Sequence, residues 1–182
     1  RLHEKVFEDR FHYWADKLGY ITWAEWGNWG ANENAKGTET AFMHEWPKIV
    51  EHLKNHPSII TWTPFNETNT LECNAQHKKL MRLAFDVTKK IDPTRPVNET
   101  SGYQHQKTDI WTVHNYEPIP EKFNKALNPK KGVYRNFPHF ETIYKNRPYI
   151  IDEYGGVWWL PQTLRKKMRS WGHGDAVRPK TL

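Results

Sequence analysis

Two glutamates, Glu67 and Glu153, each stand directly after a short apolar segment that is typical of a buried strand. Hydrolysis of a glycosidic bond needs two carboxyl groups, one to protonate the leaving oxygen and one to attack the anomeric carbon or activate water. Asn-Glu pairs occur at 32–33, 66–67 and 98–99, and only the pair at 66–67 follows a strongly apolar strand pattern. At this level the pattern fits a catalytic pair, and it also fits ordinary loop carboxylates.

Other polar groups stand at the same kind of position. Glu25 follows the first predicted strand, His114 and Tyr116 follow a later one, and Asp152 directly precedes Glu153. In folds built from parallel strands, functional side chains gather at the carboxyl ends of the strands. We therefore expect these groups to meet at one edge of a sheet.

The elements that must position these groups alternate along the chain. Apolar residues recur with helical spacing in three segments, 6–18, 42–55 and 74–91. Aromatic and β-branched runs predict strands near 20–24, 58–63, 96–98, 109–113 and 149–152. Pro47 predicts a kink or a late start in the second helix, 116–138 reads as a long loop, and 140–144 as a short helix. Alternating helices and buried strands predict parallel pairing and an α/β fold.

Composition narrows the class of protein. Aromatic residues make up 14% of the 182 residues, which argues against disorder, and no apolar run is long enough for a membrane span. The net charge of +6 is spread over predicted helix faces, and without a nucleic-acid-binding motif we expect no nucleic-acid partner. Cys73 stands alone. No histidine pair has metalloprotease spacing, so we expect neither a metal nor a cofactor.

Longer strings now resemble glycoside hydrolase family 2. The segment from His56-Pro57-Ser58 into Phe65-Asn66-Glu67 looks like the acid/base segment of that family, and 148–156 looks like its nucleophile segment. Further similar strings are Trp14-Ala15-Asp16-Lys17-Leu18-Gly19, Asp92-Pro93-Thr94-Arg95-Pro96-Val97 and Val113-His114-Asn115-Tyr116. The resemblance implies an α/β fold, a partial (β/α)8 TIM barrel from about the end of strand 2 through strand 7, with residues 1–182 as one incomplete catalytic domain.

The resemblance also implies roles for single residues. Glu67 would be the general acid/base and Glu153 the nucleophile of a retaining exo-β-glycosidase. Asn66 would bind the sugar 2-hydroxyl, Tyr116 would hold the nucleophile, and His114 would line the sugar pocket. Arg1 and His3 would support the catalytic carboxylates or only neutralise them. Trp158 would be a sugar platform or a packing residue, as would Trp159.

Several properties stay open at this point. A retaining glycosidase and a non-catalytic carbohydrate-binding or inactive barrel fragment are both compatible with the sequence. The sugar would be a β-galactoside, with β-glucuronide or β-mannoside as alternatives; no cationic motif for a glucuronate stands out. Because strands of a complete barrel of about 250 residues are missing, we expect little or no activity from these residues alone. A homo-oligomeric parent, and a cytoplasmic, periplasmic or extracellular bacterial location, are open.

Overall fold

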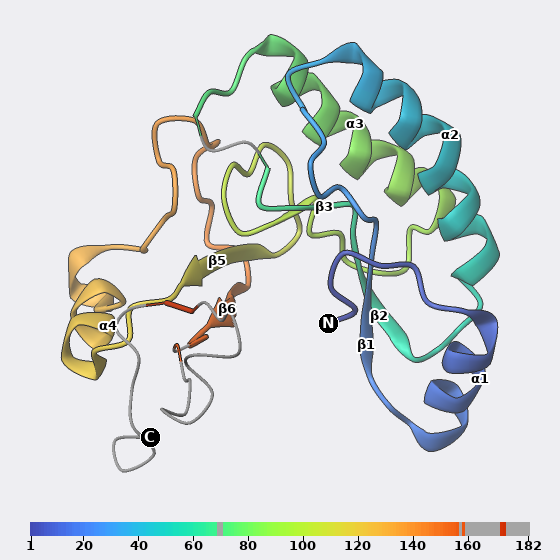
Figure 1. Cartoon of the computed structure of the whole chain (residues 1–182), viewed down its shortest axis with the longest axis horizontal. Helices are drawn as coiled ribbons and strands as arrows, with labels where there is room; N and C mark the ends of the chain where they lie inside the picture. The colour runs from blue at the N-terminus through green and yellow to red at the C-terminus, as the bar shows by residue number, and fades with distance from the viewer. Residues whose placement is uncertain (69–70, 157, 159–171, 174–182) are drawn as a thin grey trace, which may run out of the picture.

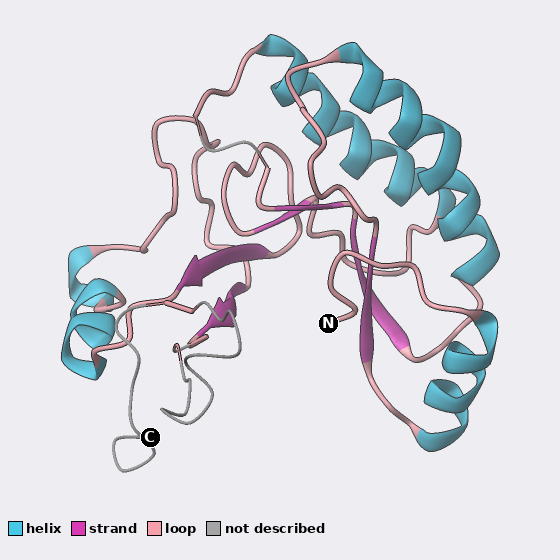
Figure 2. Cartoon of the chain, in the orientation of Figure 1, coloured by secondary structure: helices cyan, strands magenta, loops and turns pink. Residues whose placement is uncertain are grey.

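The computed structural model describes residues 1–68, 71–156, 158 and 172–173. Helices and strands alternate in the order α1 (Asp9–Leu18), β1 (Thr22–Glu25), α2 (Lys36–Leu53), β2 (Ile59–Thr63), β3 (Phe65–Asn66), α3 (Ala75–Ile91), β4 (Thr100–Ser101), β5 (Trp111–Asn115), α4 (Pro120–Ala126), the 3-10 helix Pro129–Lys131 and β6 (Tyr149–Tyr154). Figures 1 and 2 show α2 and α3 side by side on the outside of β2 and β3. The expected α/β fold is confirmed. No described helix has the length and apolarity needed to cross a bilayer.

All strand pairings among the described residues are parallel and join segments that follow one another in the chain. β1 pairs with β2, β3 with β4, and β5 with β6. Single bridges add Leu2 to Ala24 and Trp62 to Val97. The described strands form three separate two-stranded sheets and no closed barrel. The barrel range and the extent of the domain therefore stay predictions.

Several element boundaries differ from the expectations. The helix predicted at 42–55 starts earlier, at Lys36, and continues through Pro47, so a late start is wrong. The predicted strand at 96–98 is a single bridge at Val97, and the strand follows at Thr100–Ser101. The predicted loop contains α4, whose first turn carries Pro120, where the missing N–H costs nothing. Residues 140–144 form a turn, a bend and irregular backbone rather than a helix.

Local signals explain the helices that were predicted well. Gly19 ends α1 with a φ of 67°, a left-handed conformation that glycine adopts without strain. At the start of α3, the Asn74 side chain accepts a hydrogen bond from the His77 backbone N–H at 3.0 Å. These caps fix where each helix meets the strand beside it.

The hydrophobic core lies between the helix pair α2 and α3 and strands β1 to β3. Phe42 and Trp46 on α2 pack against Trp62 and Phe65, and all four are fully buried. The motif at 92–95 closes one end of this core. Arg95 donates to the carbonyls of Lys54 and His56 at 2.7 and 2.8 Å and pairs with Asp92 at 2.6 Å. The string at 92–97 therefore resembles the family for a structural reason, because Arg95 holds the chain segment between α2 and β2.

Candidate active site

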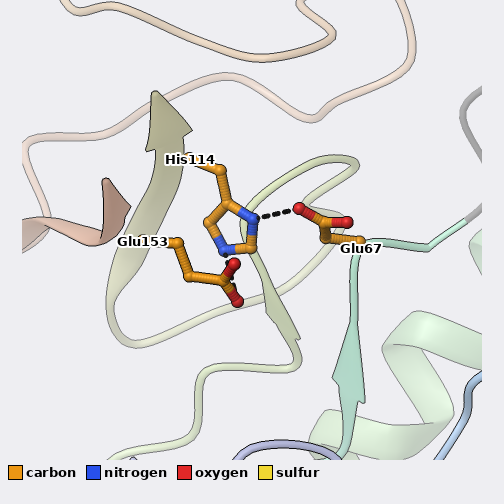
Figure 3. A group of neighbouring side chains, drawn as sticks. All are labelled: Glu67, His114 and Glu153. Carbon is orange, nitrogen blue, oxygen red and sulfur yellow. Dashed lines mark hydrogen bonds and ion pairs between the residues drawn. The ribbon is translucent and has the colours of Figure 1, made fainter. Parts of the chain in front are cut away.

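The polar groups expected at strand ends do meet. Glu67 follows β3, His114 lies on β5, and Glu153 lies on β6. Figure 3 shows the His114 ring between the two glutamates, with one ring nitrogen facing each carboxylate. Nδ1 lies 2.5 Å from Glu67 Oε1 and Nε2 lies 3.6 Å from Glu153 Oε1. Three side chains from three strands thus form one cluster.

Glu67 sits in an unusual backbone conformation. Its φ is 42°, a left-handed value that is rare for a residue with a side chain and recurs at functional sites. The backbone N–H donates to the Ser101 carbonyl at 3.0 Å, which ties the residue to β4. The Tyr116 hydroxyl donates to Glu67 Oε1 at 3.1 Å. His114 and Tyr116 therefore orient the carboxylate through the same oxygen, Oε1.

Glu153 is held by a cation and a phenol. Arg1 donates to one of its oxygens and Tyr116 donates to the other. The Tyr116 hydroxyl contacts both glutamates, and burial together with the bond to Glu153 raises its pKa, so it remains a donor. One oxygen of Glu67 lies within 4.8 Å of one oxygen of Glu153. This separation is well below the about 6.5–9.5 Å found between carboxyl groups of inverting enzymes.

Arg1 is the centre of the network on the Glu153 side. Its guanidinium lies 2.7 Å from Glu25 Oε1 and 3.3 Å from Asp152 Oδ2. It also donates to the Asn66 side-chain oxygen at 3.2 Å. His3 lies at the edge of this group, with Nδ1 3.4 Å from Glu25 Oε2. Arg1, His3 and Asn66 are therefore brought together with the two glutamates, as the sequence predicts.

The pKa of Glu67 is shifted in the direction opposite to the one expected for a general acid. A retaining glycosidase needs a protonated acid, so the sequence argument predicts that the pKa of Glu67 is raised. Burial does act in that direction, but hydrogen bonds from His114, Tyr116 and Tyr103 outweigh it and hold the pKa of Glu67 below its usual value. Burial lowers the pKa of His114, yet its bonds to Asp152 and Glu67 raise it to about 9. Both shifts favour a charged His114 ring beside an ionised Glu67.

The family model for "Glycosyl hydrolases family 2, TIM barrel domain" matches residues 12–159 of this chain. The chain belongs to glycoside hydrolase family 2. The match includes Glu67, His114, Tyr116 and Glu153 and leaves Arg1 outside. The resemblance seen in the short strings is thus confirmed over most of the chain.

Relatives within the family carry different names. A β-galactosidase from Psychromonas ingrahamii is 41% identical over an alignment of 125 residues that covers 63% of this chain and 10% of that protein. A β-glucuronidase from Streptococcus agalactiae is 22% identical over 152 residues, covering 75% of this chain and 25% of its own length. The chain therefore spans between a tenth and a quarter of the length of these two family 2 relatives.

Solved structures show the same fold. A β-glucuronidase from an uncultured Clostridium superposes with a TM-score of 0.67 at 15% identity, over 88% of this chain and 30% of that one. A β-D-glucuronidase from Dictyoglomus thermophilum gives 0.62 at 18% identity, over 88% and 30%. These likenesses support the family 2 fold and, at such low identity, carry no information on the sugar.

Sequence reasoning missed three groups at this family 2 site. The Asn28 side chain exchanges two hydrogen bonds with the Asn66 backbone, at 2.7 and 2.9 Å. Tyr103 hydrogen-bonds Glu67, and Ser101 contacts His114. Asp152, which was expected at this sheet edge from its place at the end of a strand, also contacts His114. The three missed groups become neighbours of the site through folding alone.

The last predicted site residue does not join the cluster. Trp158 is half-buried, and its backbone lies so close to Gly172 that a Cβ there would stand 2.4 Å from its Cα. Among the described residues, no hydrogen bond or ring contact connects Trp158 with Glu67 or Glu153. Trp159 lies outside the described residues. A role for Trp158 as a sugar platform or as a packing residue stays a prediction.

The same cluster meets the distance requirement for a metal ion. One donor atom from each of Glu67, His114 and Glu153 lies within 4.8 Å of the others. A metal would need the His114 nitrogen without its proton, so it would compete with the pairing seen here. The expectation that no metal is needed stays a prediction.

The raised pKa of His114 predicts a pH dependence of stability. A histidine in the unfolded chain has a pKa of about 6.5. Because the folded value is about 9, the stabilisation from the charged ring is complete below pH 6.5 and is lost as the pH rises through 9. Over this range the free energy of unfolding should fall by on the order of 3 kcal/mol more than in His114→Asn.

The measurement is urea unfolding followed by circular dichroism at pH steps from 6 to 10. His44→Asn is the matched control, because His44 is exposed on α2, and it should keep the wild-type slope. Equal slopes for the wild type and His114→Asn would show that His114 is not charged in the folded protein.

Proposed function

We propose that this chain carries the catalytic groups of a retaining, exo-acting β-glycosidase that hydrolyses terminal β-galactosides by double displacement. The observation that carries this proposal is the approach of Glu67 and Glu153 to within 4.8 Å at the ends of parallel strands. Retaining glycosidases place their two carboxyl groups about 5–5.5 Å apart. A protein that only binds sugar needs neither carboxylate.

The two glutamates take different roles because their partners differ. Glu153 is the nucleophile, since Arg1 donates to one of its oxygens and Tyr116 to the other, so that the carboxylate is held in a fixed orientation. Its oxygen attacks the anomeric carbon as the bond to the leaving oxygen breaks, and Glu67 gives that oxygen a proton. In the second step Glu67 takes a proton from water, the water oxygen attacks the anomeric carbon, and Glu153 is released.

The acid form of Glu67 can come from His114. The ring Nδ1 lies 2.5 Å from Glu67 Oε1, so a proton shift along this bond converts the resting ion pair into a neutral ring and a neutral acid. A sugar that displaces water from around Glu67 favours the neutral pair, because desolvation penalises charge. Asp152, 3.3 Å from Nε2, then stabilises the ring until it is reprotonated.

The choice of a neutral sugar rests on charge and on the relatives. A glucuronide needs a cation for its carboxylate, and Arg1 near Glu153 is already paired with three carboxylates. The relative with 41% identity is named a β-galactosidase. Asn66, held at its oxygen by Arg1, is placed to donate to the sugar 2-hydroxyl.

A trapped intermediate tests this proposal. A 2-deoxy-2-fluoro-β-galactosyl fluoride slows both steps through its C2 fluorine, but fluoride leaves readily, so a covalent sugar ester accumulates on the nucleophile. We expect intact-mass spectra to gain one fluorogalactosyl unit and peptide mapping to place it on Glu153. Glu153→Gln should stay unlabelled. Labelling of another carboxylate would contradict the assignment, and labelling only by a fluoroglucuronyl or fluoromannosyl reagent would contradict the sugar.

A further inference from the structure

The second ring nitrogen of His114, Nε2, meets a serine and an aspartate from two different strands. Ser101 Oγ on β4 lies 3.0 Å from Nε2, and Asp152 Oδ1 on β6 lies 3.3 Å from it. Ser101 is fully buried, and the side chains of His114 and Asp152 are 1% and 3% exposed. The three groups therefore meet away from bulk water, on the side of the ring opposite to Glu67.

The donor and acceptor directions of the Ser101 hydroxyl follow from its partners. A serine hydroxyl has one proton to donate and two lone pairs that accept. Its proton goes to Asp152 Oδ2 at 2.6 Å, because an ionised carboxylate only accepts. Arg1, which only donates, occupies one lone pair. The other lone pair faces Nε2, so Nε2 carries a proton and donates it to Ser101.

Asp152 is ionised in this arrangement. Burial raises the pKa of its carboxyl group, but the bonds from His114 and Ser101 and the charge of Arg1 outweigh burial and hold that pKa below its ordinary value. Among the described residues, Asp152 Oδ1 is left to the ion pair with Nε2. The carboxylate thus attracts the Nε2 proton directly through Oδ1 and through Ser101 at Oδ2.

The two ring nitrogens face unequal numbers of carboxylates. Nδ1 lies 2.5 Å from Glu67 Oε1, whereas Nε2 lies 3.3 Å from Asp152 and 3.6 Å from Glu153. The charged and titratable groups that face the ring are Glu67, Tyr103, Tyr116, Asp152 and Glu153, with Arg1 behind Ser101. Because two carboxylates and a serine oxygen surround Nε2, its proton is held more firmly than the proton on Nδ1.

We infer that Asp152 is a positioning residue, which acts through Ser101 to keep one proton on Nε2 of His114. The ring then exchanges only its Nδ1 proton with Glu67. This inference rests on the proposed function, because it uses Glu67 as the acid and base. Asp152 itself contacts neither the sugar nor the leaving oxygen in this role.

The proton balance of the reaction closes on the ring. In the first step the Nδ1–H bond breaks and its electron pair stays on the nitrogen. The proton forms an O–H bond at Glu67, which passes it to the leaving oxygen. In the second step Glu67 takes a proton from water and returns it to Nδ1, so His114 ends charged as it began. An aspartate behind the histidine of serine proteases holds one tautomer in the same way, and its exchange for asparagine lowers kcat about 10⁴-fold.

Imidazole ¹⁵N spectra of the whole 182-residue chain test the inference without a substrate. Protonated and unprotonated ring nitrogens have well-separated ¹⁵N shifts, and the His114 signals are identified by their absence in His114→Asn. At pH 7 both nitrogens should be protonated. Above the pKa of about 9, Nδ1 should be bare while Nε2 keeps its proton. A neutral wild-type ring with its proton on Nδ1 would overturn the inference.

Asp152→Asn should lower the pH midpoint of the His114 ring by about one unit or more, because a neighbouring negative charge is lost. The neutral ring should then carry its proton on Nδ1, where Glu67 attracts it. Asp9→Asn is the matched control, because Asp9 pairs with His52 at 2.7 Å on the surface, and it should leave the His114 signals unchanged. An unchanged midpoint and tautomer in folded Asp152→Asn would show that Asp152 does not act on the ring.

Ser101→Ala is the second variant, and it decides the inference if circular dichroism shows that Asp152→Asn does not fold. It removes the bridge between Nε2 and Asp152 Oδ2 and keeps the negative charge. The midpoint of His114 should fall below the wild-type value while the neutral ring keeps its proton on Nε2. A wild-type midpoint in Ser101→Ala would exclude the path through the serine.

Kinetics of an active enzyme that contains these residues separate the inference from the proposed function. Asp152→Asn should lower kcat about tenfold or more for a poor leaving group, and should change sugar-ester formation from a dinitrophenyl substrate by less than about twofold, because that step needs no acid. If the fluorosugar labels Glu153 but Asp152→Asn slows both substrates equally, or neither, the positioning role is wrong. If Glu153 is not labelled, the proposed function fails, and the ¹⁵N spectra still decide where His114 keeps its proton.

Discussion

In an active enzyme that contains these residues, Glu153→Gln is expected to abolish turnover of an aryl β-galactoside, with a loss of at least about 10⁴-fold in kcat, as for other covalent nucleophiles. The amide is isosteric with the carboxylate but cannot form the sugar ester. Its exchange also removes the negative charge that Arg1 contacts, although Glu25 and Asp152 still pair with that guanidinium at 2.7 and 3.3 Å. The fold should therefore survive the change, and the loss should be chemical.

The control for this variant is Glu117→Gln. Glu117 follows the same strand as Tyr116, but its carboxylate accepts from the Ile119 backbone N–H at 3.0 Å and makes no hydrogen bond or ion pair with the described site residues. It should keep wild-type kcat/KM, and circular dichroism should show both variants folded. Turnover by a folded Glu153→Gln protein within tenfold of wild type would exclude Glu153 as the nucleophile.

The position of the site could be predicted from the sequence, but many of the contacts within it could not. The strands at 59–63 and 149–154 were expected within a few residues because their runs of β-branched and aromatic residues are uninterrupted. The carboxylates directly after them could be placed at one sheet edge from the parallel order alone. The strand at 100–101 was not found, because Thr100 and Ser101 have no apolar pattern and their burial comes entirely from their neighbours.

Groups whose roles arise from long-range contacts could not be identified from the sequence. Asn28 looks like a loop residue, yet its two bonds to the Asn66 backbone fix the strand end that carries the acid. The predicted direction of the Glu67 pKa shift was wrong for a related reason. The sequence shows two carboxylates that repel one another, and only the folded structure places the His114 imidazole between them.

That imidazole is itself positioned by the fold. Asn136 holds the His114 backbone through two hydrogen bonds, at 3.0 and 2.8 Å. Gly102 lies beneath the ring, where an added Cβ would stand 2.7 Å from Cδ2. A left-handed φ of 64° at the same residue also favours glycine. The glycine at position 102 thus leaves space for the His114 ring between the carboxylates of Glu67 and Glu153.

Glu67→Gln should separate the two chemical steps. An amide can neither donate the proton nor act as a base. With a poor leaving group the first step should slow by about 10²–10⁴-fold, the usual contribution of general acid catalysis. With a good leaving group such as dinitrophenol the first step needs no acid, so the sugar ester should form at nearly the wild-type rate. Its hydrolysis should then become rate-limiting, because the base is missing.

Azide tests the second step directly. A small anion needs no general base, and the site vacated by the Glu67 charge admits it, so azide should restore turnover of the dinitrophenyl substrate and yield a β-galactosyl azide. Glu72→Gln is the control, since Glu72 is exposed and its carboxylate accepts a hydrogen bond from Asn34 at 3.4 Å, away from His114 and Glu153 among its described contacts. It should behave as wild type and show no azide effect. Wild-type rates for Glu67→Gln on the poor leaving group would remove Glu67 as the acid, and an α-azide product would remove the retaining mechanism.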